Sequence, residues 1–226
     1  MRKSIKYFLI SLCFFVNLIF ANYQFETIAS NLDDAWSFDF LNENQIIFTE
    51  QPGKIKIVTI SSGEILNVEG APKVQYASQG GLSEIVLDPD FKKNNTLYLT
   101  YSALNESGKS TLFLMSAELS NNSLINKKVI FEANASRRVP IHLGAKIDFL
   151  SDGTLLLTSG DGFDYKEQAQ SLNNHFGKII RINKDGSVPS DNPFVDIPNV
   201  LPEIYSYGHR NMPVSYTHLR AHETDR

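Results

Sequence analysis

Cysteine is nearly absent from this sequence: the single one, Cys13, lies within an apolar run close to the N-terminus. That run follows a basic start and leads to Ala21, which is the layout of a secretory signal peptide spanning residues 1–21. A membrane-spanning helix needs about 20 apolar residues, and this run is shorter, so a cleaved signal is favoured over an uncleaved anchor. We therefore expect a periplasmic or secreted protein with no stable membrane insertion.

Removal of Cys13 with the signal leaves no thiol in the chain, which excludes disulfides, thiolate metal sites and a Cys nucleophile. Basic residues are outnumbered as well, because 21 Lys and Arg face 25 Asp and Glu. An exported chain with this acidic balance has no electrostatic reason to bind nucleic acid. The remaining length is sufficient for one sizeable core held by ordinary packing.

No stretch shows a sustained helical period, and the pattern is instead one of short strands separated by turn residues. Three segments (38–50, 85–102 and 147–161) each contain an apolar strand, a polar turn and a second apolar strand. The second strands end in Thr49, Thr100 and Thr158, so the repeat is about 50 residues long. Strand repeats of this length predict an all-β protein, a β-propeller with about three blades in this chain. A sandwich with similar hairpins is the alternative fold.

Two polar side chains stand where expected strands begin, and in a propeller the position of His142 is the mouth of the channel. Gln79 precedes Gly80 and Gly81, a pair that lets a ligand or another backbone approach closely but also forms ordinary turns between blades. His142 precedes the first strand of the third repeat. A neutral imidazole there can accept a proton near neutral pH, or simply cap the strand.

Further candidates lie later in the chain. Asp161 and Asp164 suit a cation, but Asp-Gly pairs also make plain turns. Arg210 has a planar fork of donors that suits carboxylate or quinone oxygens, and Asn211 adds a donor and an acceptor. His209 is an alternative base beside them.

Taken in order, these motifs resemble the soluble glucose and aldose sugar dehydrogenases that depend on pyrroloquinoline quinone (PQQ). The motifs are Gln-Gly-Gly-Leu, His-x-Gly, Gly-Lys-Ile-x-Arg-Ile, an Asp-Gly stretch ending in Asp-Asn-Pro-Phe, and Gly-His-Arg-Asn. The resemblance runs from about Asp33 to Asn211 and implies the six-bladed propeller of that family. It also implies oxidation of the C1 hydroxyl of aldose sugars to lactones, with hydride transfer to PQQ and an external electron acceptor.

The resemblance assigns roles to individual residues. His142 matches the general base, whereas Gln79, Arg210 and Asn211 match residues that contact PQQ. A Ca²⁺ ion bridging protein and PQQ oxygens is implied too, with ligands expected outside this chain, so no metal ligand is named here.

The chain departs from the family pattern in two places near the base. Ile141 stands where the glucose-oxidising branch has an acidic residue, so the base lacks that partner and the broader aldose branch fits better. Ala145 and Lys146 replace a usual Gly-Arg pair, which keeps the charge and loses a forked donor.

Residues 212–226 show neither a strand period nor turn chemistry, and we expect them to be a foreign, adapter-derived tail. The expected organisation is a signal peptide (1–21), the N-terminal part of a propeller dehydrogenase (22–211) and this tail. Such a part of an enzyme is expected to be inactive alone. A non-catalytic propeller of the same lineage, which binds a ligand or a protein, is the alternative function.

Overall fold

The computed structural model of the chain describes residues 25–212. The expected signal peptide and residues 213–226 of the expected tail lie outside this range. Within it the regular secondary structure consists almost wholly of antiparallel strands. The exceptions are the single-turn helix α1 (Phe91–Asn94) and the 3₁₀ segment η1 (Lys166–Gln170). No helix of residues 25–212 is long and apolar enough to cross a membrane.

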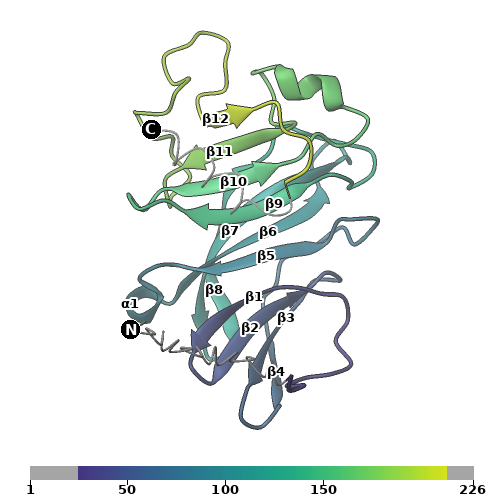
Figure 1. Cartoon of the computed structure of the whole chain (residues 1–226), viewed down its shortest axis with the longest axis vertical. Helices are drawn as coiled ribbons and strands as arrows, with labels where there is room; N and C mark the ends of the chain where they lie inside the picture. Colours follow the sequence, from purple (N-terminus) through teal and green to yellow (C-terminus); the bar gives the residue numbers. More distant parts are fainter. Residues whose placement is uncertain (1–24, 213–226) are drawn as a thin grey trace, which may run out of the picture.

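The strands form three four-stranded sheets, stacked one above another in Figure 1. The first sheet contains β1 (Ala35–Asn42), β2 (Gln45–Glu50), β3 (Lys54–Thr59) and β4 (Ile65–Val68). The second contains β5 (Leu82–Leu87), β6 (Thr96–Leu104), β7 (Ser110–Ser120) and β8 (Ser123–Glu132). The third contains β9 (Gly144–Phe149), β10 (Leu155–Ser159), β11 (Lys178–Ile182) and β12 (Ile204–Tyr207).

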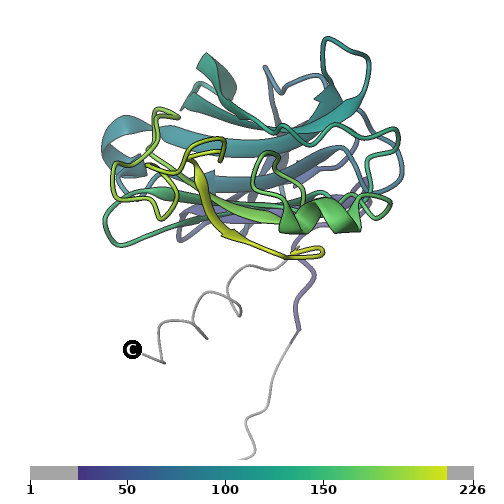
Figure 2. The ribbon, with the colours of Figure 1, turned by 90° about the horizontal axis from the view of Figure 1, so that it is seen from above.

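Each sheet is a propeller blade whose strands follow one another in chain order. The first strands are the inner ones, because β1 contacts β5 and β5 contacts β9. Seen from above, the third sheet overlies the other two (Figure 2). The prediction of an all-β propeller with three blades in this chain is confirmed.

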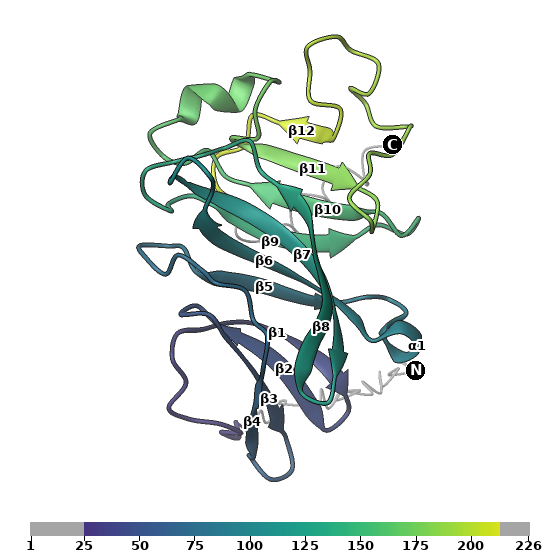
Figure 3. The same cartoon turned by 180° about the vertical axis from the view of Figure 1, so that it is seen from behind.

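Two apolar layers hold the blades together. The layer between the first and second sheets includes Ile47, Ile57, Leu82, Leu97 and Leu99. The layer between the second and third includes Leu112, Leu114, Ile147, Leu157 and Ile180. Figure 3 shows the long β7–β8 hairpin reaching across to the first sheet, where Leu124 donates its backbone N–H to the Glu69 carbonyl at 2.8 Å. Burial on both sides explains why the middle strands read as nearly continuous apolar runs.

The three threonines of the sequence repeat make the same inter-blade contact. Each hydroxyl oxygen accepts a backbone N–H from the first strand of its own blade, at distances of 3.0 to 3.2 Å. Each then donates to a carbonyl where the next blade begins, at 2.7 Å for Thr49, 2.6 Å for Thr100 and 2.9 Å for Thr158. The acceptors are, in the same order, Ser83, Ala145 and Met212. We call these contacts the threonine latches.

Met212 thus occupies the position that starts the inner strand in the earlier blades. Its side chain is buried against Leu156 and Ile179, on the outer face of the third sheet. Met212 therefore packs as part of the propeller repeat. The expectation that residues 212–226 are a foreign, adapter-derived tail stays a prediction.

Candidate active site

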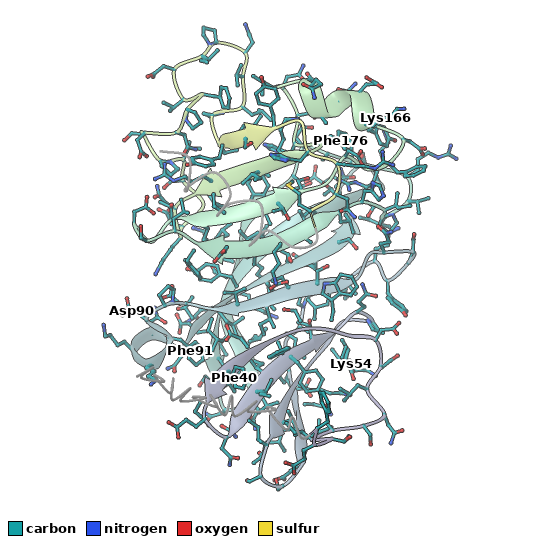
Figure 4. All side chains as sticks on the ribbon, in the orientation of Figure 1. Phe40, Lys54, Asp90, Phe91, Lys166 and Phe176 are labelled. Carbon is teal, nitrogen blue, oxygen red and sulfur yellow. The ribbon has the colours of Figure 1, made fainter. Side chains whose placement is uncertain are left out.

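The structure brings the four predicted site residues together. Gln79 lies just before β5, His142 lies just before β9, and Arg210 with Asn211 follows β12. These are neighbouring ends of two inner strands and of the last strand of the third blade. Figure 4 labels Lys166 and Phe176 on the insertion between β10 and β11, which borders the same site.

The backbone of His142 is held from both sides. Its N–H donates to the Gln79 side-chain oxygen at 2.8 Å, and its carbonyl accepts from Arg137 Nη1 at 2.9 Å. Its φ of +48° lies in the left-handed region, which is uncommon for a residue other than glycine. Gly160 makes this position possible, because a Cβ there would lie 2.1 Å from the His142 carbonyl oxygen.

The imidazole of His142 is oriented by a buried carboxylate. Its Nδ1 lies 2.8 Å from Asp161 Oδ1, and the Asp161 side chain is only 2% exposed. An ionised carboxylate accepts hydrogen bonds and donates none, so the proton of the neutral ring sits on Nδ1. Nε2 then carries the lone pair, and it has no hydrogen-bond partner among residues 25–212. This arrangement fits a general base that acts from Nε2.

Asp161 also changes the interpretation of the departure at Ile141. The apolar Ile141 suggested that His142 lacks an acidic partner. The structure supplies that partner as Asp161, just after the end of β10. The sequence pointed to Asp161 only as a cation ligand or a turn residue. The two residues are 19 positions apart, one just before β9 and the other just after β10, so only the antiparallel pairing of these strands reveals the contact.

Arg137 is a buried cation beneath the site that the sequence did not single out. Its guanidinium is 1% exposed and donates to the carbonyls of Ala135, Ile141 and His142. Burial lowers the pKa of Arg137 to about 10, while the nearby Asp161 charge opposes this shift. The group therefore remains charged at neutral pH and fixes the loop that carries His142.

Arg210 and Asn211 close another side of the site. The Arg210 carbonyl accepts the Asp161 N–H at 2.6 Å, and its guanidinium lies 5.7 Å from the centre of the Phe163 ring. Asn211 accepts the Gly144 N–H through its side-chain oxygen at 3.2 Å. These contacts set both residues beside the loop of His142 and leave their side-chain N–H donors without a partner in residues 25–212.

The donors around His142 fit an acceptor-rich molecule. The guanidinium of Arg210 and the NH₂ groups of Asn211 and Gln79 make no hydrogen bond within the described part of the chain. PQQ offers quinone and carboxylate oxygens, which match such donors. No group of three His, Cys, Asp or Glu side chains in residues 25–212 is arranged to hold a metal ion.

The other candidates lie apart from this cluster. His209 pairs its Nε2 with the Ser206 hydroxyl at 2.9 Å. Asp164 is exposed, and its backbone N–H donates to the Gly162 carbonyl. Gly80 and Gly81 form the tight inter-blade turn, since a Cβ on Gly81 would lie 2.2 Å from the Gln51 carbonyl. Lys146, the replacement for a usual Arg, pairs with Glu84 across the second and third blades.

Comparison with known proteins gives a consistent family. Residues 32–223 match the sequence profile described as glucose/sorbosone dehydrogenase. The chain is 29% identical over 194 residues to the aldose sugar dehydrogenase YliI of Escherichia coli, covering 84% of this chain and 52% of that protein. It is also 29% identical over 222 residues to quinoprotein glucose dehydrogenase B of Acinetobacter calcoaceticus, covering 84% of this chain and 45% of that protein.

A solved glucose dehydrogenase structure has the same fold, with a TM-score of 0.76 and 34% identity over 80% of this chain and 53% of the other. The chain spans about half the length of the relatives it matches. On the profile match and the shared fold, the chain belongs to the glucose/sorbosone dehydrogenase family.

Proposed function

We propose that the whole protein oxidises the C1 hydroxyl of aldose sugars to lactones with PQQ as its cofactor. The observation that carries this proposal is the His142–Asp161 pair, set among three side chains with free N–H donors. The names of the matched relatives, an aldose sugar dehydrogenase and a quinoprotein glucose dehydrogenase, support the same chemistry.

Each described residue has a part in this proposal. His142 Nε2 accepts the proton of the C1 hydroxyl, and Asp161 stabilises the imidazolium that results. Arg210 and Asn211 donate hydrogen bonds to cofactor oxygens, where Arg210 offsets negative charge. Gln79 uses its oxygen to fix the base and its NH₂ group to contact the cofactor. When bound, PQQ supplies the two-electron acceptor.

Ca²⁺ and the electron acceptor remain proposals carried by the family resemblance alone. The described residues hold no cluster suited to Ca²⁺, so no step is assigned to it. We propose export to the periplasm or the medium, on the layout of residues 1–21. We also propose that the 226-residue chain has no turnover by itself, since it spans about half of each relative.

The test is dye reduction by the full-length protein loaded with PQQ and Ca²⁺. Glucose and other aldoses should reduce an artificial electron acceptor only when PQQ is present. His142→Ala should lower kcat about 10²–10⁴-fold while PQQ still binds. His209→Ala is the matched control and should keep turnover. Tight PQQ binding with no reduction by any aldose would overturn the proposal and favour a binding protein.

A further inference from the structure

Phe163 is an exposed aromatic residue held in an unfavourable backbone conformation beside the proposed base. Its φ is +63°, and 50% of the residue is exposed. The left-handed region is a genuine outlier for a bulky residue and costs about 1–2 kcal/mol. Because half of the residue is exposed, burial in a core does not offset this backbone strain. Backbone strain of this kind, once observed, points to a functional role.

The loop that carries Phe163 is tied directly to His142. Asp161 Oδ1 accepts the Phe163 backbone N–H at 2.9 Å and also contacts His142 Nδ1 at 2.8 Å. The preceding Gly162 donates its N–H to the His142 carbonyl at 3.3 Å. One carboxylate oxygen of Asp161 therefore fixes both the backbone of Phe163 and the imidazole of His142.

The ring of Phe163 contacts two groups of the site. It meets the His142 imidazole edge to face, with ring centres 5.2 Å apart and planes at 85°. The Arg210 guanidinium lies 5.7 Å from the ring centre. Exposed carbon surface thus lies beside both the imidazole proposed to accept the proton and a donor proposed to contact the cofactor.

A sugar ring presents hydroxyl groups around its edge and C–H groups on its faces. The electron-rich face of an aromatic ring attracts the weakly positive hydrogens of such a C–H face, and the contact removes apolar area from water. Hydrogen-bond donors contact the hydroxyl groups at the edge of a sugar ring and leave its C–H faces without a partner. An aromatic wall beside His142 orients the ring relative to Nε2.

We propose that Phe163 is a specificity-determining residue that packs against a C–H face of the pyranose ring and thereby presents the C1 hydroxyl to His142. The inference rests on the proposed sugar oxidation. It predicts a preference for cyclic aldoses over open-chain polyols, because a flexible polyol has no fixed face to pack on this ring.

The test compares Phe163→Leu and Phe163→Tyr in the full-length protein loaded with PQQ and Ca²⁺. The Leu variant should raise KM for glucose about 3- to 10-fold, with kcat within about twofold. The Tyr variant retains the aromatic face and should keep KM near the wild-type value. Phe25→Leu is the matched control, because Phe25 is 98% exposed and should tolerate the change.

A second readout does not depend on turnover. Saturation-transfer NMR with glucose should show transfer to the ring C–H protons in wild type and in the Tyr variant, and a clear loss in the Leu variant. An unchanged KM and unchanged transfer in the Leu variant would overturn the inference. So would a fall in kcat with unchanged KM, which would mean that Phe163 only positions His142 or Arg210. Transfer without turnover in wild type would instead count against the proposed oxidation.

Discussion

At the scale of single residues, the direction of one hydrogen bond decides which nitrogen of His142 is available. Asp161 accepts from Nδ1 inside the loop, so Nε2 is the nitrogen left toward a substrate. The proposed mechanism therefore depends on a carboxylate that contacts no substrate. Asp161 is a positioning residue, and it acts through the tautomer and charge of the imidazole.

Asp161→Asn should lower kcat about 10²–10⁴-fold, because the amide keeps a similar shape but loses the charge that stabilises the imidazolium. Steady-state dye reduction with PQQ-loaded protein measures this effect. Asp164→Asn removes an exposed carboxylate of the same loop and should have little effect. Equal rates for both variants would exclude a special role for Asp161.

Ala145 gives a second prediction at this scale, since its φ is +71° and it replaces a usual glycine. Ala145→Gly relieves about 1–2 kcal/mol of left-handed strain but adds about 0.5–1 kcal/mol of backbone entropy. It also removes a buried methyl group worth about 0.8 kcal/mol. These effects nearly cancel, so urea unfolding should give a free energy within about 1 kcal/mol of wild type.

The control for that prediction is Ala117→Gly, at a buried position of β7 without a positive φ. There the same change brings no strain relief, and the loss should be about 1–2 kcal/mol. If both variants lost equal stability, the left-handed backbone at Ala145 would be contradicted.

At the scale of elements, the threonine latches join each blade to the next. Thr100 satisfies the Glu84 N–H and the Ala145 carbonyl together, and all three residues are buried. Thr100→Val should therefore lower the free energy of unfolding by about 1–3 kcal/mol, because two buried backbone groups lose their partner. Thr100→Ser retains the hydroxyl and should lose less, and the order of the two variants in urea denaturation checks the latch.

A second set of contacts between elements surrounds Arg181, and we call it the Arg181 clamp. Its guanidinium binds Asp152 of the β9–β10 turn at 2.6 Å, Asp191 at 2.8 Å and Asn192 at 3.2 Å. This explains the Asp-Asn-Pro-Phe stretch, whose first two residues anchor a long loop onto β11. The stretch stabilises the fold and does not contribute to the His142 cluster.

Acid titration tests this clamp. The hydroxyl and N–H of Thr154, together with Arg181, lower the pKa of Asp152 from 3.8 to about 2. Because the folded pKa is the lower one, the stabilisation is present above pH 3.8 and is lost as the pH falls toward 2. The difference in urea midpoint between wild type and Asp152→Asn should be constant from about pH 5 to 7 and shrink below about pH 4. A difference independent of pH would contradict the assigned cause.

At the scale of the whole molecule, the first sheet exposes an apolar face. Trp36, Phe38 and Phe40 alternate along β1 and are 51%, 60% and 55% exposed, whereas Ser37 between them is buried against the second blade. In a closed ring this face packs against another blade, as the inner faces of the three described blades do.

Trp36 is the single tryptophan of the chain, so its fluorescence reports on this face. Before the 226-residue chain associates, its emission should be that of a partly water-exposed indole, and self-association through the open face should shift this emission to shorter wavelength. The double substitution of Phe38→Ser and Phe40→Ser should reduce association in sedimentation experiments. A monomeric wild-type chain with a cooperative melt would contradict this view of the open face.

The sequence by itself determined the strands, their turns and the repeated threonines, because alternation and turn chemistry act between near neighbours. It also indicated Gln79, His142, Arg210 and Asn211 through a family resemblance. Only the tertiary structure decided that these four meet, and that Asp161, Arg137 and Phe163 complete the site. Those contacts join residues from different strands and loops, and their geometry is set by how sheets pair and stack, which no local pattern encodes.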